Sequence, residues 1–408
     1  MIFERELYLS QIRPYYDMDL IKVLTGIRRS GKSMILRMIM KELLQKGVGK
    51  DHIIFMNLED MSFSNITDAL ALHEYIKSKI ADSNKYYILI DEVQYVDKFE
   101  KALSSFKATL NCSIFVTGSN STLLSGELAT LLTGRTKEFK ILPFSYKEAV
   151  DFLKFRGAEV PRNFFYDYLK WGGFPQRFDM FDEMSVYSYL SDLYNSIKYK
   201  DIVSKNSLDK NKFDKFASYI LSNCGSTFTP DNIVNYDKAN NSKGKAEVSK
   251  STLYSYSEYL ERAYLINKIQ RFDISGKKVL ITQEKYYASD MGLCTINTNT
   301  LNFQDTFFLE NVIYLELLRR NYLVFIGKTF KGEVDFVAVR QSKKCFIQIS
   351  YLLNSEKTIE REFSAFDCIS DNSPKYVFSL DEIDFSRNGI THINIIDFLL
   401  GEKDITLS

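Results

Sequence analysis

An eight-residue stretch near the start of the chain, GIRRSGKS, constrains the fold more than any other segment. It runs from Gly26 to Ser33 and fits the pattern G-x-x-x-x-G-K-[ST] without a mismatch. The apolar run IKVL precedes it, and MILRMIMKELLQK follows with apolar residues at helical spacing. A strand, a glycine-rich turn and a helix in this order predict a phosphate-binding loop (P-loop), in which backbone N–H groups surround phosphate oxygens at the helix N-terminus.

The positions of this loop have expected tasks in binding ATP and Mg²⁺. Gly26 and Gly31 let the backbone turn tightly, Lys32 reaches the β- and γ-phosphates, and the hydroxyl of Ser33 binds Mg²⁺. The predicted nucleotide-binding residues are Gly26, Ile27, Arg28, Arg29, Ser30, Gly31, Lys32, Ser33 and Met34, with Asn120 farther along the chain.

A pair of acids follows a second apolar strand, in YYILIDE. An Asp at the end of such a strand holds the water shell of Mg²⁺, which assigns Asp91 to the metal. Glu92 is then placed to polarise the attacking water, and Glu92 and Lys32 are predicted to be catalytic. An acidic pair alone more often caps a helix, but together with the loop it favours the catalytic interpretation.

Two more apolar strands, in HIIFMNLED and CSIFVTGSNSTLL, also end in polar residues. Alternating strands and helices with polar groups at the carboxyl ends of the strands predict an open parallel sheet with its ligand at that edge. Thr117, Ser119 and Asn120 at the end of the second strand either sense the γ-phosphate or form a turn that caps the next helix.

The order of GIRRSGKS, ILIDE, VTGSNS and LLTGRTKEFKILPFSYKE resembles the prokaryotic AAA+ ATPases of uncharacterised function that carry a nuclease-related C-terminal domain. The resemblance covers nearly the whole chain and includes GGFP, YNSIKYKDIV and KYYASDMGL farther on. It implies that Arg135 in TGRT is catalytic and acts on the γ-phosphate, in its own chain or in a neighbouring subunit. A surface ion pair is the alternative for this arginine.

Spacing and resemblance together predict an α/β chain in four parts. They are an AAA+ P-loop core at 1–145, a helical lid at 146–204, a winged-helix-like domain at 205–295 and a PD-(D/E)XK nuclease-like domain at 296–408. The middle domain is expected from a helix, helix, hairpin order. DNA contact through the middle or C-terminal domain and plain protein interaction both remain open, because the net charge is only +1.

The stretch EVDFVAVRQSKKCFIQIS bears on whether the C-terminal part cleaves DNA. The nuclease resemblance maps its metal-binding acids onto Glu310 and Asp335, but Gln348 and Ser350 stand where Glu and Lys are expected. A neutral Gln is a poorer ligand for a hard cation than a carboxylate. We expect a metal-site remnant at Glu310, Asp335 and Gln348 without cleavage, and slow cleavage with Lys357 as a substitute is the alternative.

The remaining sequence features favour a cytoplasmic protein. No apolar run approaches the length of a membrane span, and the first residues lack the apolar core of a signal peptide. The predicted function is an ATP-hydrolysing switch that acts on a nucleic-acid or protein partner. An ATP-dependent DNA nuclease and a non-hydrolysing nucleotide-binding scaffold are the alternatives, and a homo-oligomer is compatible with each.

Overall fold

The computed structural model describes residues 2–119, 134–240, 248–298, 306–330 and 332–407. The chain folds into two compact units. Unit 1 comprises residues 1–143 with 262–264, and unit 2 comprises residues 144–261 with 265–408.

Unit 1 is built on a five-stranded parallel sheet with the strand order β2-β3-β4-β1-β5. The strands are β1 (Ile21–Thr25), β2 (Ile53–Asn57), β3 (Tyr86–Asp91), β4 (Cys112–Thr117) and β5 (Thr136–Lys140). Every residue of β1 and β3 is buried, as expected for central strands covered on both faces. The predicted parallel sheet is therefore confirmed.

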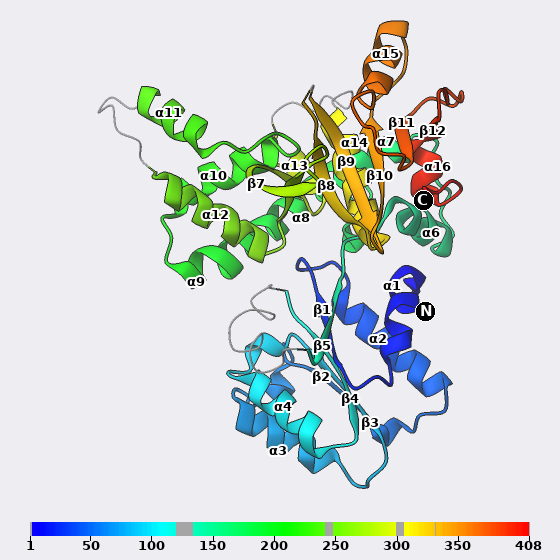
Figure 1. Ribbon diagram of the computed structural model, residues 1–408. Coiled ribbons are helices and arrows are strands. Elements are labelled where there is room, and N and C mark those ends of the chain that lie inside the picture. The colour runs from blue at the N-terminus through cyan, green and yellow to red at the C-terminus, as the bar shows by residue number, and fades with distance from the viewer. Residues whose placement is uncertain (1, 120–133, 241–247, 299–305, 331, 408) are drawn as a thin grey trace. The chain divides into compact units, whose positions relative to one another are not determined.

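Helices cover both faces of this sheet (Figure 1). They are α1 (Glu6–Ile12), α2 (Lys32–Gln45), α3 (Ala69–Lys79) and α4 (Phe99–Thr109). One apolar cluster joins α1 and α2 to one face, and a second joins α3 and α4 to the other. Because β4 lies between β1 and β3, the polar end of β4 stands between the P-loop and the acids that follow β3.

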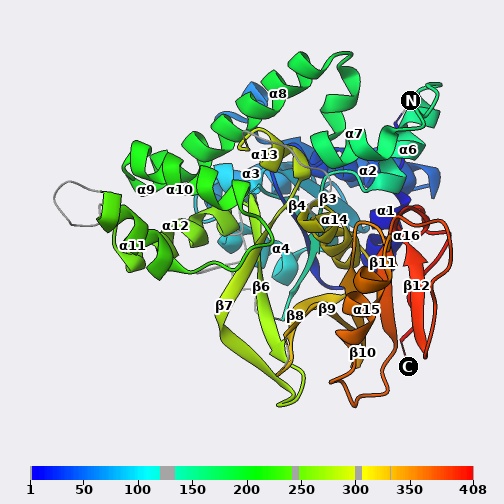
Figure 2. The same cartoon turned by 90° about the horizontal axis from the view of Figure 1, so that it is seen from above.

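Unit 2 contains a seven-stranded mixed sheet in the order β12-β11-β10-β9-β8-β6-β7, which Figure 2 shows from edge to edge. The strands are β6 (Ile266–Asp273), β7 (Lys278–Ala288), β8 (Leu323–Lys328), β9 (Glu333–Arg340), β10 (Lys343–Ile349), β11 (Lys375–Ser379) and β12 (Ile390–Asn394). The turn between β9 and β10 has two residues, Gln341 and Ser342, with φ values of 51° and 66°. Two positive φ values in a two-residue loop match the twist of an antiparallel hairpin.

The helices of unit 2 come mostly before this sheet. They are α6 (Tyr146–Phe155), α7 (Phe164–Trp171), α8 (Glu183–Ser196), a π-helix (Ile197–Val203), α9 (Ser204–Asn206), α10 (Lys210–Ser222), α11 (Pro230–Asn240), α12 (Lys250–Arg262), α13 (Met291–Thr295), α14 (Thr306–Arg319), α15 (Glu356–Ser364) and α16 (Ile395–Leu400). Most residues of α14 are buried, on every side of the helix, so α14 is a central helix of the unit.

The predicted lid, winged-helix-like and nuclease-like segments all fall within unit 2. The hairpin expected to be a wing is present as β6 and β7, but β6 also pairs in parallel with β8. The hairpin thus extends the C-terminal sheet, because the unpaired edge of β6 would otherwise expose its backbone N–H and C=O groups. The predicted boundary at 295 separates strands that belong to one sheet.

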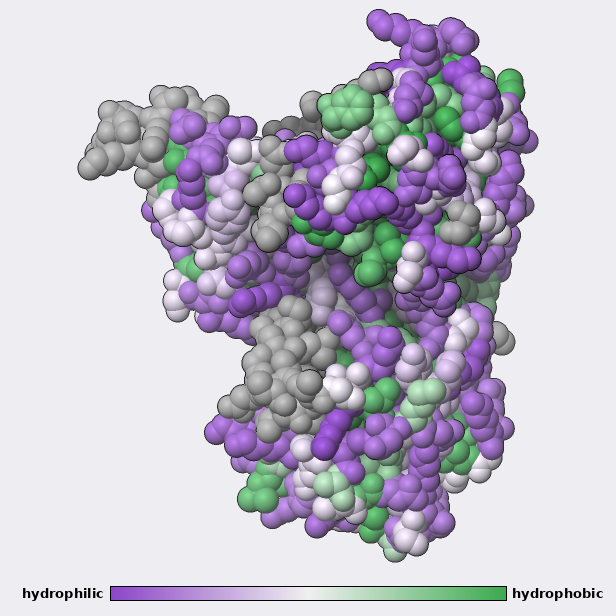
Figure 3. All heavy atoms as spheres, viewed as in Figure 1, coloured by the Kyte–Doolittle hydropathy of each residue, from purple (hydrophilic) through white to green (hydrophobic). Residues whose placement is uncertain are grey.

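The surface of the molecule is mixed in character. Hydrophilic residues cover most of the face shown in Figure 3, and hydrophobic residues are scattered among them in small groups. Within the described ranges, no helix combines the length and the apolar character that crossing a membrane requires.

Candidate functional site

The P-loop follows β1 and turns where its two glycines permit it. Gly26 has a φ of 134°, and a Cβ atom there would lie 2.1 Å from the carbonyl oxygen of Ile141. Gly31 has a φ of 101° and directly precedes α2. Arg29 also has a positive φ, of 68°. The loop conformation therefore depends on positions that most side chains would strain.

Lys32 is buried at the start of α2 with its ammonium group folded back onto the loop. It donates hydrogen bonds to the carbonyl oxygens of Gly26 (2.9 Å) and Ile27 (3.1 Å). Only 3% of Lys32 is exposed, so its charge lies inside the loop that is predicted to surround phosphates.

The hydroxyl of Ser33 and the carboxylate of Asp91 meet at the carboxyl end of the sheet. Thr117 donates to Asp91 Oδ1 at 2.5 Å. Burial raises the pKa of the Asp91 carboxyl, and the nearby hydroxyl groups of Thr117 and Ser33 oppose that rise. The structure thus brings together the two residues that the sequence assigns to Mg²⁺.

Glu92 follows Asp91 with a left-handed backbone conformation, at a φ of 56°. Its N–H donates to Thr117 Oγ1 at 2.9 Å, so one hydroxyl contacts both acidic residues. The Glu92 carboxylate accepts hydrogen bonds from Gln94 Nε2 and, at 3.4 Å, from Ser119 Oγ. Left-handed geometry in a non-glycine residue is uncommon and concentrates at functional sites.

The other predicted residues of this site have varied surroundings. Ile27 and Ser30 are buried, and Met34 is 40% exposed. Arg28 forms an ion pair with Glu59 at 3.7 Å. Asn120 lies outside the described residues.

Arg135 is not brought to the P-loop of its own chain. The backbone N–H of Ile21 donates to its carbonyl oxygen, and the next residue, Thr136, pairs with Ile21 at the amino end of β1. The loop begins at the other end of β1, about 17 Å away at roughly 3.3 Å per residue. The exposed Arg135 side chain therefore lies near the opposite edge of the sheet from Lys32.

Within unit 2, hydrogen bonds connect the GGFP turn to the start of α13. Asp290 accepts hydrogen bonds from the N–H groups of Gly173 (2.6 Å) and Gly292 (2.9 Å). Burial raises the pKa of Asp290 to about 6, although these N–H groups act in the opposite direction. Asp290 thus links the GGFP turn to the KYYASDMGL stretch, which are far apart in the sequence.

The acids of the C-terminal segment lie near a lysine of the preceding hairpin, Lys285, which is not among the predicted site residues. Lys285 on β7 forms an ion pair with Glu333, which also pairs with Arg271 at 2.7 Å. Burial lowers the pKa of Lys285, but the negative charges of Glu310 and Glu333 outweigh this effect and raise it. Lys357, the expected substitute, is exposed on α15.

Gln348 is engaged in a network of hydrogen bonds. Its oxygen accepts from the N–H of Asp335 (3.3 Å), and its Nε2 donates to Glu362 (3.0 Å). Asp335 in turn accepts from the N–H of Ile349 at 2.7 Å. Burial and the nearby charge of Glu310 hold the pKa of Asp335 well above its usual value.

The pKa of Glu310 is also raised, chiefly by burial, and Tyr287 donates to its carboxylate at 2.7 Å. In the part of the chain that the structure describes, no three Asp, Glu, His or Cys side chains form a group that could hold a metal ion. At the predicted remnant, Gln348 and Asp335 are hydrogen-bonded to each other, and Glu310 is bonded to Tyr287 and acts on Asp335 through its charge.

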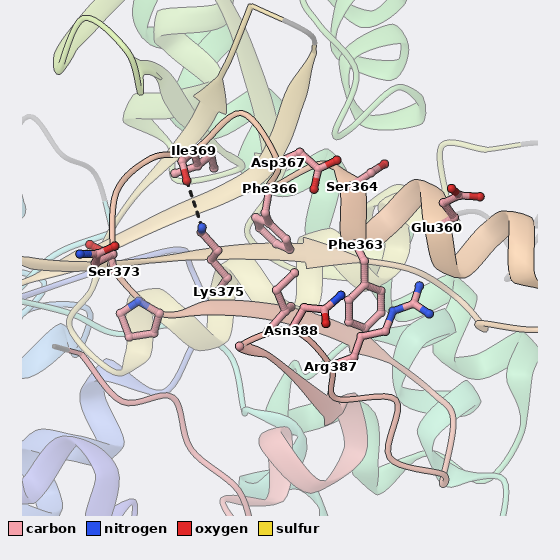
Figure 4. A pocket seen from close by; sticks show the side chains of 14 residues that line it. Glu360, Phe363, Ser364, Phe366, Asp367, Ile369, Ser373, Lys375, Arg387 and Asn388 are labelled. Carbon is pink, nitrogen blue, oxygen red and sulfur yellow. Dashed lines mark hydrogen bonds between the residues drawn. The ribbon is translucent and has the colours of Figure 1, made fainter.

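A groove of 530 Å³ lies between α15 and the two chain segments around Lys375 and Asn388 (Figure 4). Its labelled charged side chains are of both signs, and Lys375 donates to the carbonyl oxygen of Ile369 at 3.0 Å. None of the predicted site residues lines this groove.

Comparisons with known proteins place the first part of the chain in a family. A family model described as an AAA domain matches residues 19–150, which contain the P-loop, Asp91 and Glu92. A second model, described as a domain of unknown function, matches residues 162–303. The AAA match confirms the predicted P-loop domain and leaves the nuclease-like domain a prediction.

Two solved structures show a distant likeness. Orc1 from Aeropyrum pernix, solved in complex with DNA, is 13% identical with a TM-score of 0.33, over 73% of this chain and 92% of that chain. AMPPCP-bound DnaA from Aquifex aeolicus is 12% identical with a TM-score of 0.31, over 64% and 89%. These scores are too low to transfer any property to this chain.

Two sequence relatives are much closer. An uncharacterized protein from Haemophilus influenzae is 34% identical over 412 residues, which cover 98% of this chain and 99% of the relative. The uncharacterized protein MJ1544 from Methanocaldococcus jannaschii is 32% identical over 92% and 85%. The chain therefore belongs to the family of these two proteins and carries an AAA domain in its first 150 residues.

Proposed function

We propose that this protein binds ATP with Mg²⁺ and hydrolyses it, and that hydrolysis switches its action on a nucleic-acid or protein partner. The observation that carries the proposal is the meeting of Ser33, Asp91 and Glu92 beside Lys32. The hydroxyl of Ser33 lies close enough to the carboxylate of Asp91, on a separate element, to exert a lowering effect on its pKa. The carboxylate of Glu92 belongs to the next residue in the chain.

The oxygens present at this position fit Mg²⁺. Ser33 and Asp91 offer one hydroxyl and one carboxylate, and Mg²⁺ in such sites commonly takes one or two protein oxygens together with waters and substrate phosphates. These two residues would hold the ion, which neutralises charge on the phosphates when it is bound.

The residues of the chain have distinct tasks in this proposal. Lys32 turns its ammonium group from the carbonyl oxygens of Gly26 and Ile27 toward the phosphates. Glu92 takes the proton of the attacking water, for which its carboxylate has to exchange the bonds from Gln94 and Ser119 for a bond to that water. Thr117 fixes the backbone of Glu92 and the carboxylate of Asp91 relative to each other.

Replacing Lys32 by Ala tests the binding step. We expect the Kd for ATP to rise about 10- to 100-fold, because charge-assisted hydrogen bonds to the phosphates are lost. Titration with a fluorescent ATP analogue measures the change. Lys77→Ala, which removes an exposed lysine from α3, is the control and should leave the Kd within about threefold of wild type. Equal affinities for Lys32→Ala and wild type would refute the proposed site.

Arg135 enters this proposal through a neighbouring copy of the chain. It is exposed and lies far from the P-loop of its own chain. These two facts fit a role at the nucleotide of another subunit in a homo-oligomer, where an arginine stabilises the charge of the transition state.

We further propose that the C-terminal part recognises a partner without cleaving it. Both polar groups of the Gln348 side chain are already bonded within the chain, and Lys285 pairs with Glu333. On the middle segment, Lys250 forms an ion pair with Asp231, which reduces the positive charge available to a phosphate backbone.

Incubating the protein with plasmid and single-stranded DNA tests this second point. With ATP and either Mg²⁺ or Mn²⁺, we expect the DNA to remain intact on a gel while phosphate is released. Cleavage that disappears in Asp335→Ala but persists in Asp384→Ala, an exposed acid elsewhere in unit 2, would establish the nuclease alternative.

A further inference from the structure

Arg5, just before α1, is a buried residue that the P-loop pattern does not predict. Only 2% of it is exposed, and burying a guanidinium group is costly unless it is hydrogen-bonded. Its Nη1 donates to the carbonyl oxygen of Ser30 at 2.8 Å, and its Nη2 donates to that of Leu142 at 2.9 Å. A single side chain therefore joins the end of the P-loop to the chain that follows β5.

The bond to Ser30 fixes a peptide group of the loop. A trans peptide is planar, so its C=O and the next N–H point in opposite directions. Because Arg5 holds the carbonyl of Ser30, the N–H of Gly31 points away from Arg5. A Cβ atom at Gly31 would lie 3.3 Å from Arg5 Nη1, which is a tight contact.

The other anchor of Arg5 is itself held in place. The N–H of Leu142 donates to the hydroxyl of Tyr8 at 3.0 Å, and the Arg5 guanidinium lies 4.5 Å from the centre of the Tyr8 ring. The N–H of Ile141 donates to the carbonyl oxygen of Thr25 at 2.8 Å, just before Gly26. Residues 141 and 142 thus contact the loop at its start directly and at its end through Arg5.

We propose that Arg5 is a positioning residue for the nucleotide phosphates: it orients the Ser30–Gly31 peptide so that the N–H of Gly31 donates to a phosphate oxygen. Its positive charge behind the loop adds to the potential at the N-terminus of α2, which favours anions. The inference rests on the proposed function, since it concerns how the same loop grips ATP.

Arg5→Ala and Arg5→Lys test the inference, with Arg13→Ala as the matched control. Arg13 is in the same N-terminal region but is partly exposed and pairs with Glu6 and Glu42. We expect the Kd for ATP to rise about 10- to 100-fold in Arg5→Ala, since a charge-assisted bond that orders the binding N–H is lost. Arg5→Lys keeps the charge without the fork of two donors and should give an intermediate Kd.

The thermal midpoint and a rescue experiment separate positioning from mere stabilisation. Guanidinium chloride at a sub-denaturing concentration should restore ATP binding to Arg5→Ala relative to sodium chloride at equal ionic strength, and should not restore it to Lys32→Ala. Arg13→Ala is expected to lower the thermal midpoint while its Kd stays within about threefold of wild type, because a partly exposed ion pair acts on stability alone.

The outcomes distinguish this inference from the proposed function. If wild type and Arg13→Ala bind ATP and both Arg5 variants bind it equally well, the role of Arg5 is refuted and the ATP site stands. If Arg5→Ala does not fold, the Kd of Arg5→Lys decides, and a value equal to wild type refutes the role. If wild type itself binds no ATP, the proposed function fails and the inference fails with it.

Discussion

Replacing Glu92 by Gln is expected to slow ATP turnover by about 100-fold or more, because a positioned general base commonly contributes 10²- to 10⁴-fold to a rate. The amide has the size of the carboxylate, and its oxygen can still accept hydrogen bonds from Gln94 and Ser119. The substitution therefore removes the capacity to take a proton and keeps the local packing. Binding should persist, since Lys32, Ser33 and Asp91 are unchanged.

Steady-state phosphate release and ATP titration check this prediction together. The Kd for ATP should remain within about threefold of wild type while kcat falls. Glu74→Gln, on the exposed side of α3, is the control and should alter neither value. Phosphate release by Glu92→Gln at a wild-type rate that is well above the protein-free background would exclude Glu92 as the base. Wild-type release no faster than that background would favour the non-hydrolysing scaffold.

Replacing Gly172 by Ala is expected to destabilise unit 2 by about 4 kcal/mol or more, at the upper end of the range for single substitutions. A Cβ atom there would lie 1.7 Å from Asp290 Oδ1, and Gly172 has a φ of 70° and a ψ of −162°, a region open almost only to glycine. Asp290 cannot move aside without losing its bonds from Gly173 and Gly292. Denaturant unfolding measures the loss.

Two other glycines separate the two causes of this loss of stability, backbone strain and steric clash. Gly157 has a φ of 73°, and a Cβ atom there would meet no atom within 4 Å, so Gly157→Ala should cost only about 1 to 2 kcal/mol of backbone strain. Gly173 does not have a positive φ, but its Cβ atom would lie 2.1 Å from the carbonyl oxygen of Phe144. Gly173→Ala should therefore resemble Gly172→Ala. Equal stabilities of the Gly172 and Gly157 variants would contradict the steric argument.

The elements around the P-loop were predictable because their signals are local. A fixed spacing of glycines, lysine and serine follows an apolar strand, and the helix expected from MILRMIMKELLQK is present as α2. Predicting that the acids at the end of β3 lie beside the loop required one more fact. Parallel strands end at the same edge of a sheet. Both inferences depend on the spacing of residues within short segments, and this spacing does not depend on the rest of the fold.

The position of Arg135 could not be predicted from local spacing alone. Arg135 directly precedes β5, so it lies at the amino end of that strand. Because β5 pairs in parallel with β1, this end faces away from the P-loop, and the direction of pairing is not encoded in the segment around Arg135. Arg5, Lys285 and Asp290 were missed for a related reason. Each is polar and lies in an apolar or charged stretch without a pattern of its own, and each acquires its role from partners far along the chain.

The bond from Gly173 to Asp290 also sets an order of events during protein synthesis. The two residues are 117 positions apart. At about 5 to 20 residues per second, a ribosome needs roughly 6 to 23 seconds to add the missing length. During that interval the GGFP turn has no carboxylate to hold it, whereas residues 1–143, apart from three later residues, already contain the sequence of unit 1. The nascent chain therefore presents a nearly complete AAA domain followed by helices that are made before Asp290, the residue that anchors the GGFP turn.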